Sequence, residues 1–132
     1  MQVSLPVAVS ELYDRLSIIE IKAARITDEA KLVNIRHELA LLRREEAKIA
    51  WARTCPATYL KITTLVEELK ATNEKIWDAI DIVGRLAKVQ GPEFNQAALD
   101  TFLLNIERCK RKREIDEALG SSILEEKQYY SA

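Results

Sequence analysis

The sequence predicts an all-α protein: an antiparallel four-helix bundle with a short extended N-terminal arm. The 132-residue chain contains only three glycines and three prolines, the residues that most disfavour helices. Its apolar residues recur every three or four positions along nearly the whole chain, which is the period of a helix face. Short breaks separate these segments, as between antiparallel neighbours. The length suits one domain, residues 10–132, preceded by an arm at residues 1–9.

The arm alternates instead of following the helical period. Apolar side chains stand at every second position, at Val3, Leu5, Val7 and Val9. Pro6 lacks an N–H and restricts any strand here to the edge of a sheet. The rest of the chain shows no second strand pattern. The arm is therefore expected to lie in a groove of its own bundle or to pair with a second copy, and the second choice predicts a homodimer.

The first two helices are predicted from their capping residues and their apolar faces. Ser10 is predicted to cap the first helix. Its apolar face consists of Leu12, Leu16, Ile19, Ala23 and Ile26. Asp28 is predicted to cap the second helix, which ends before the break at Cys55 and Pro56 because a residue before proline avoids helical geometry. The second apolar face consists of Leu32, Ile35, Leu39, Leu42 and Ile49.

The last two helices are expected over residues 57–89 and 93–119, with Gly91 and Pro92 between them. The third carries Ile62, Val66, Leu69, Ile76, Ile80 and Val83, with Asn73 as a polar interruption. The fourth carries Ala98, Phe102, Ile106 and Cys109, after which the same face reaches Arg113. Gly120 ends this helix, and Ser122 with Glu125 predicts a capping box for one further short turn.

Composition excludes several classes of protein. Twenty basic and 21 acidic residues nearly cancel, so no global field draws the chain to nucleic acid or to a membrane. The longest uncharged run, residues 1–10, is too short to span a bilayer and lacks the pattern of a signal peptide. A cytoplasmic location is expected. Cys55 and Cys109 are far apart, which favours reduced thiols over a disulfide or a zinc site.

A basic run, RCKRKR at residues 108–113, opens the C-terminal part of the fourth helix. Acidic residues follow within helical spacing, so the run is expected to be neutralised locally. No aromatic residues or wide positive face accompany it, which argues against nucleic acid. Arg113 is different, because it occupies an apolar face where a charge is costly without a partner. It is a candidate binding residue, and a solvated helix end is the alternative.

Counting residue heights from the turns places several polar side chains at one level of the bundle. This predicts a mid-bundle polar layer of Glu20, Arg36 or His37, Asn73, Trp77 and Arg113. Each member also has a plainer interpretation. Asn73 suits a residue that sets helix register, His37 a surface histidine and Trp77 a core side chain.

An acidic stripe of Glu74, Asp78 and Asp81 lies on the third helix. It is similar to the magnesium-binding carboxylates of all-α nucleotide pyrophosphohydrolases, although the spacing differs, and a solvated face is the favoured interpretation. Bundles of the chorismate-mutase kind are another all-α possibility, but their basic spacing is not visible here. No metal site and no cofactor are therefore expected, with magnesium as the alternative.

Both ends of the chain resemble one known family. The segments SELYDRLSIIEIKAARITDEAKLVNIRHEL, residues 10–39, and KREIDEALGSSILEEKQY, residues 112–129, are similar to the opening and close of small uncharacterised helical proteins of bacteria and phages. Genes of that family often lie near glycosyltransferase and surface-polysaccharide genes. The matching positions are Asp14, Glu20, Lys22, Asp28, Lys31, Lys112, Arg113, Glu114, Gly120, Ser121, Glu126 and Lys127. The sequence departs from the family pattern at Asp116 and Gln128.

Two functions are expected from the resemblance and the polar layer together. The first is a cytoplasmic accessory or ligand-binding protein in surface-polysaccharide metabolism, with a glycosyltransferase or another protein of that pathway as a possible partner. The second is a small enzyme, pyrophosphohydrolase-like or mutase-like, acting on a phosphorylated or carboxylated molecule. The candidate binding residues are Glu20, Lys22, Asn73, Trp77, Lys112, Arg113, Glu126 and Lys127.

Overall fold

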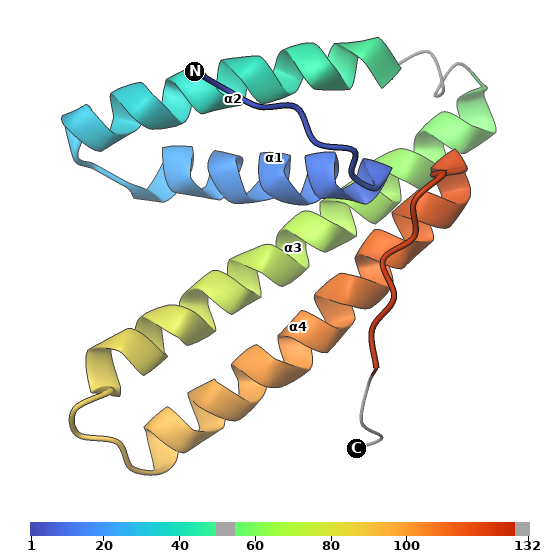
Figure 1. Ribbon diagram of the computed structural model, residues 1–132. Helices are drawn as coiled ribbons and strands as arrows, with labels where there is room; N and C mark the ends of the chain where they lie inside the picture. The colour runs from blue at the N-terminus through green and yellow to red at the C-terminus, as the bar shows by residue number, and fades with distance from the viewer. Residues whose placement is uncertain (50–54, 129–132) are drawn as a thin grey trace.

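The computed structural model describes residues 1–49 and 55–128, which form four helices and no strand (Figure 1). The helices are α1 (Val9–Arg25), α2 (Glu29–Ile49), α3 (Pro56–Leu86) and α4 (Pro92–Leu119). The predicted all-α helical bundle is confirmed. Within the described ranges, no helix combines the length and the apolar character needed to cross a membrane.

The helices are arranged as two antiparallel hairpins, α1 with α2 and α3 with α4 (Figure 1). The hairpins meet where α1 begins and α4 ends, and they diverge toward their turns. Helix α1 is the element that joins them, since it packs against α2, α3 and α4. The bundle is thus V-shaped, and its four helices do not share one common axis.

The main core lies at the junction of the two hairpins. It consists of Tyr13, Leu16, Leu65, Leu69 and Ile115, which come from α1, α3 and α4. Leu39 and Leu42 of α2 pack against this cluster from outside. A second, smaller cluster of Ile19, Leu32 and Ile35 holds α1 to α2. Burial of these apolar side chains is the main stabilising contribution to both helix pairings.

The predicted helix ends at Asp28 and Gly120 are confirmed, and the predicted cap at Ser10 is wrong. The Asp28 carboxylate accepts a hydrogen bond from the Lys31 N–H at 3.0 Å, so it caps α2 as predicted. Gly120 ends α4 with a left-handed φ of 65°, a conformation that glycine adopts without steric cost. Ser10 does not cap α1, which begins at Val9. Its N–H and hydroxyl instead donate to Asp116 at 2.7 and 2.8 Å.

The chain after Gly120 is extended and runs back along α4, so the predicted turn at Ser122–Glu125 is wrong (Figure 1). Ser121 redirects the chain at this point. Its hydroxyl donates to the Ile123 carbonyl at 2.7 Å and accepts from the Val9 N–H at 3.3 Å. Residues 121–128 are called the C-terminal segment below.

Three of the four alternating side chains of the N-terminal arm are exposed, and the fourth, Val9, packs partly buried against the main core. Val3 is 78% exposed, Leu5 and Val7 are also exposed, and only Ala8 is buried. The arm has no strand geometry and runs beside the α1–α2 hairpin (Figure 1).

The predicted apolar face of α4 is also largely uncovered. Phe102 is 53% exposed, and Leu99 and Leu103 beside it are exposed as well. Near its C-terminus α4 buries Lys112, Ile115 and Asp116 instead. The predicted and the buried faces of α4 differ because of the V shape. Helix α1 approaches only the C-terminal end of α4 and contacts a different side of the helix there (Figure 1).

Replacing Asp116 with Ala is expected to lower the free energy of unfolding by about 2–4 kcal/mol, because the buried N–H and hydroxyl of Ser10 lose their acceptor. Urea unfolding followed by circular dichroism measures this change. The control is Glu117→Ala, which removes an exposed carboxylate one position later and should cost less than about 1 kcal/mol. Equal costs for the two variants would contradict a structural role for the Ser10–Asp116 contact.

Candidate functional site

A buried carboxylate, Asp14 of α1, joins three helices. Its side chain is 4% exposed and accepts hydrogen bonds from Asn73 of α3 at 3.0 Å and from the Arg108 Nε of α4 at 2.9 Å. A second guanidinium nitrogen of Arg108 binds the other carboxylate oxygen. Asn73 also donates to the Ser17 hydroxyl at 2.7 Å. These bonds satisfy polar groups that would be costly to bury alone.

The environment of Asp14 keeps it ionised. Burial by itself would raise the pKa of this carboxyl, but the hydrogen bonds from Arg108 and Asn73 outweigh burial and hold the pKa below its ordinary value of 3.8. The bond to Asp14 likewise raises the pKa of Arg108 above its usual value, against the effect of burial. The two groups therefore form a charged, bidentate pair.

One turn further along α4, Lys112 is the most deeply buried cation of the basic run, with an 11% exposed side chain. Burial would lower its pKa, but the hydrogen bond to Glu11 and the charge of Asp14 outweigh burial and raise the pKa. The Lys112 ammonium binds Glu11 and lies 3.5 Å from Glu125. The charge placed in a buried position is thus Lys112, one residue before the predicted Arg113.

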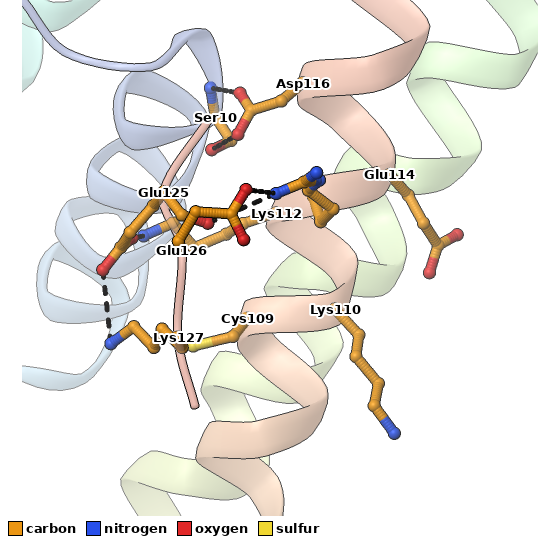
Figure 2. A pocket seen from close by; sticks show the side chains of 10 residues that line it. Ser10, Cys109, Lys110, Lys112, Glu114, Asp116, Glu125, Glu126 and Lys127 are labelled. Carbon is orange, nitrogen blue, oxygen red and sulfur yellow. Dashed lines mark hydrogen bonds and ion pairs between the residues drawn. The ribbon is translucent and has the colours of Figure 1, made fainter. Parts of the chain in front are cut away.

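A cavity of about 370 Å³ lies between α4 and the C-terminal segment (Figure 2). Basic and acidic side chains contribute equally to its charged lining. The lining residues are Ser10, Cys109, Lys110, Lys112, Arg113, Glu114, Asp116, Glu125, Glu126 and Lys127. The Ser10–Asp116 contact lies at one end, and Cys109 and Lys127 line the other (Figure 2).

Ion pairs hold the C-terminal segment against this cavity. Arg113 donates to Glu126 at 3.0 Å and to the Glu125 carbonyl at 3.4 Å, while its Nε donates to Glu117 at 3.0 Å. Glu125 also lies 3.3 Å from the Lys127 ammonium. Burial by itself would raise the pKa of Glu125, but Lys127 and Lys112 outweigh burial and lower this pKa below its usual value, so the carboxylate stays charged.

Four of the predicted binding residues line the cavity together: Lys112, Arg113, Glu126 and Lys127. Two of the others lie elsewhere and have their own partners. Glu20 pairs with Arg43 at 3.1 Å and Lys70 at 2.9 Å. Asn73 is buried in the network of Asp14.

The remaining predicted residues are also remote from the lining. Trp77 lies against Arg25, whose guanidinium carbon is 5.9 Å from the ring centroid. Lys22 lies in the last turn of α1. Arg36 and His37 are exposed on α2. The predicted mid-bundle polar layer is therefore wrong, because counting heights does not give helix rotation and the two hairpins diverge.

The sequence contains a signal for the network around Asp14, and the predicted polar layer did not use it. Ser10, Asp14 and Ser17 repeat at intervals of four and three, so they form one polar stripe on α1. Arg108, Lys112 and Asp116 repeat every four residues on α4. The stripes meet in antiparallel order, with Ser10 bound to Asp116 and Asp14 bound to Arg108.

The acidic stripe of α3 is divided among separate partners. Asp78 pairs with Arg25, and Asp81 pairs with Arg85 at 3.1 Å. Within residues 1–49 and 55–128, no three His, Cys, Asp or Glu side chains are grouped so that they could hold a metal ion. The stripe thus gives no geometric support to the magnesium alternative.

Asp14→Asn is expected to lower the free energy of unfolding at pH 7 by about 3 kcal/mol, because Arg108 loses its charged partner in a half-buried place. The folded pKa of Asp14 lies below its unfolded value, so its stabilisation is complete above about pH 4 and is lost as pH falls through the folded pKa.

The difference between wild type and Asp14→Asn should therefore shrink as urea unfolding is repeated from pH 7 down to pH 2. Asp81→Asn is the control, since this carboxylate is exposed and should change stability little at any pH. A difference for Asp14→Asn that is constant with pH would refute the charged pairing.

A scan against family models, a search of curated proteins and a search of solved structures each find no match to this chain.

Proposed function

We propose that this chain is a cytoplasmic accessory protein of surface-polysaccharide metabolism that binds a small anionic sugar derivative. The observation that carries the proposal is the side chain of Arg113, which reaches the cavity and whose guanidinium is held there by the Glu126 carboxylate. A guanidinium is suited to phosphate and carboxylate because it presents a planar fork of donors. Arg113 is 38% exposed, so a ligand can reach it.

The mixed charge of the lining supports a sugar as the rest of the ligand. The Glu114 carboxylate can accept hydrogen bonds from hydroxyl groups, while Lys110 and Arg113 can donate to anionic groups. A lining of basic residues alone would bind any anion, with or without hydroxyl groups, and so would not favour a sugar.

The polysaccharide context comes from the resemblance of the two chain ends, and both ends contribute to this cavity. Ser10 is the first residue of one resembling segment, and the other segment supplies Lys112, Arg113 and Glu126. A glycosyltransferase or another enzyme of the same pathway is the proposed protein partner. A small enzyme acting on the same ligand is the alternative, and the binding experiment below also detects turnover.

Arg113→Ala is expected to weaken binding of a sugar phosphate or nucleoside-diphosphate sugar at least roughly tenfold, because a charged donor is lost. Isothermal titration calorimetry over a panel of such ligands measures binding, and chromatography of the ligand afterwards detects any product. The unfolding free energy should change little, since the ion pairs of Arg113 are exposed.

The matched control is Arg85→Ala, because Arg85 also pairs with a carboxylate one helical turn away on an exposed surface. It should leave ligand binding unchanged. Loss of stability without loss of binding in Arg113→Ala would contradict the proposal, and so would a full panel of ligands that gives no binding to wild type.

A second copy of the chain is the proposed partner for its uncovered apolar surface. The arm presents Val3, Leu5 and Val7 to solvent, and α4 presents Leu99 and Phe102. Exposed apolar segments of this kind favour association, and natural proteins generally cover them. A two-fold dimer would bury both surfaces, because each copy supplies an arm and a helix face.

Light scattering at tens of micromolar protein is expected to give the mass of a dimer for the full chain. A chain shortened to begin at Ser10 should dimerise more weakly, because it lacks the apolar arm. A monomeric full chain would refute the dimer, and a shortened chain that dimerises equally well would exclude a contribution from the arm.

A further inference from the structure

The C-terminal segment is held by charged contacts together with partial burial of its two apolar side chains, Ile123 (39% exposed) and Leu124 (38% exposed). Ile123 and Leu124 are exposed, as are all residues from Ser122 to Gln128. Beyond Ser121, the polar contacts of residues 122–128 with the helices are the ion pair of Glu126 with Arg113, the contact of Glu125 with Lys112 and the hydrogen bond from Arg113 to the Glu125 carbonyl. The two carboxylates are the exposed partners in these pairs, and ion pairs of exposed groups contribute little stability each, so a competing anion can replace the carboxylates.

Two adjacent carboxylates face two adjacent cations at this point. Glu125 and Glu126 are consecutive in the segment, and Lys112 and Arg113 are consecutive in α4. Figure 2 shows both carboxylate side chains beside α4, where they line the cavity. The segment thus places a pair of anionic groups where the proposed function requires a ligand.

We propose that the C-terminal segment is an internal competitor for the cavity, and that the ligand displaces it by presenting two adjacent anionic groups. This inference rests on the proposed function and specifies its ligand as a diphosphate or dicarboxylate. A ligand with one anionic group can replace only one of the two contacts, so it leaves the segment in place and binds weakly. Lys110 is a further cation of the lining, with no ion-pair partner among the described residues.

The segment has a suitable pivot for displacement. Gly120 has a positive φ, and the next residue, Ser121, is fixed by its bond to the Val9 N–H. Among the described residues after Ser121, 122–128, the Arg113 contact with the Glu125 carbonyl is the only hydrogen bond between the backbone and the helices. Release of the two carboxylates therefore frees residues 122–128 and leaves the end of α4 intact.

The test compares wild type with a variant carrying Glu125→Gln and Glu126→Gln, which keeps side-chain size and removes both charges. Inorganic pyrophosphate should bind the variant roughly tenfold more tightly, because it no longer competes with the carboxylates. Phosphate should bind both proteins weakly, and succinate in a parallel titration shows whether carboxylates replace phosphates. Nuclear magnetic resonance should show sharpened signals from residues 122–128 of wild type saturated with the tighter anion.

The matched control carries Glu67→Gln and Glu93→Gln, which change the net charge equally at two exposed helix positions outside the cavity. It should bind pyrophosphate as wild type does. Sugar-phosphate binding to wild type with no gain in the Glu125/Glu126 variant would overturn the inference and leave the proposed function standing. Absence of binding by every anion and sugar phosphate, to both proteins, would overturn both.

Discussion

The contact on which the rest of the structure depends is the meeting of two polar stripes, one on α1 and one on α4. Asp14 is bound there by Arg108 and Asn73, so one buried carboxylate fixes three helices relative to one another. Apolar packing alone would allow α1 to slide along the α3–α4 hairpin, whereas a buried charge must find its own partner. The same contact sets the rotation of α4 that directs Lys112 inward and Arg113 toward the cavity.

Much of the fold could be predicted from the sequence, because local signals determine helices and their ends. Asp28 and Gly120 act at the predicted positions since capping depends only on neighbouring backbone groups. Ser10 did not follow this rule, because a distant carboxylate, Asp116, binds both its N–H and its hydroxyl. The V-shaped arrangement was not predictable from a helical period, which gives one apolar face and does not specify an angle between hairpins.

Part of the candidate site could also be predicted, because several of its residues belong to short charged runs in the sequence. The basic run and the acidic C-terminal segment are visible as sequence, and Lys112, Arg113, Glu126 and Lys127 lie together at the cavity. Glu20 was predicted from its height, level with Arg113, and from the family resemblance, although it faces Arg43 and Lys70 on another side of α1. Regular spacing of polar residues within a helix is the better guide, because spacing gives rotation as well as height.

The pairing of the first and last helices has a consequence for how the chain folds during synthesis. Ser10 and Asp116 are 106 residues apart, and Asp14 and Arg108 are 94 residues apart. Helical proteins usually fold fast because most of their contacts are local. Here α1 can pack against α2 early, yet its polar stripe has no charged partner until α4 has left the ribosome. The Asp14 carboxylate therefore acquires its charged partner, Arg108, only after α4 has been synthesised.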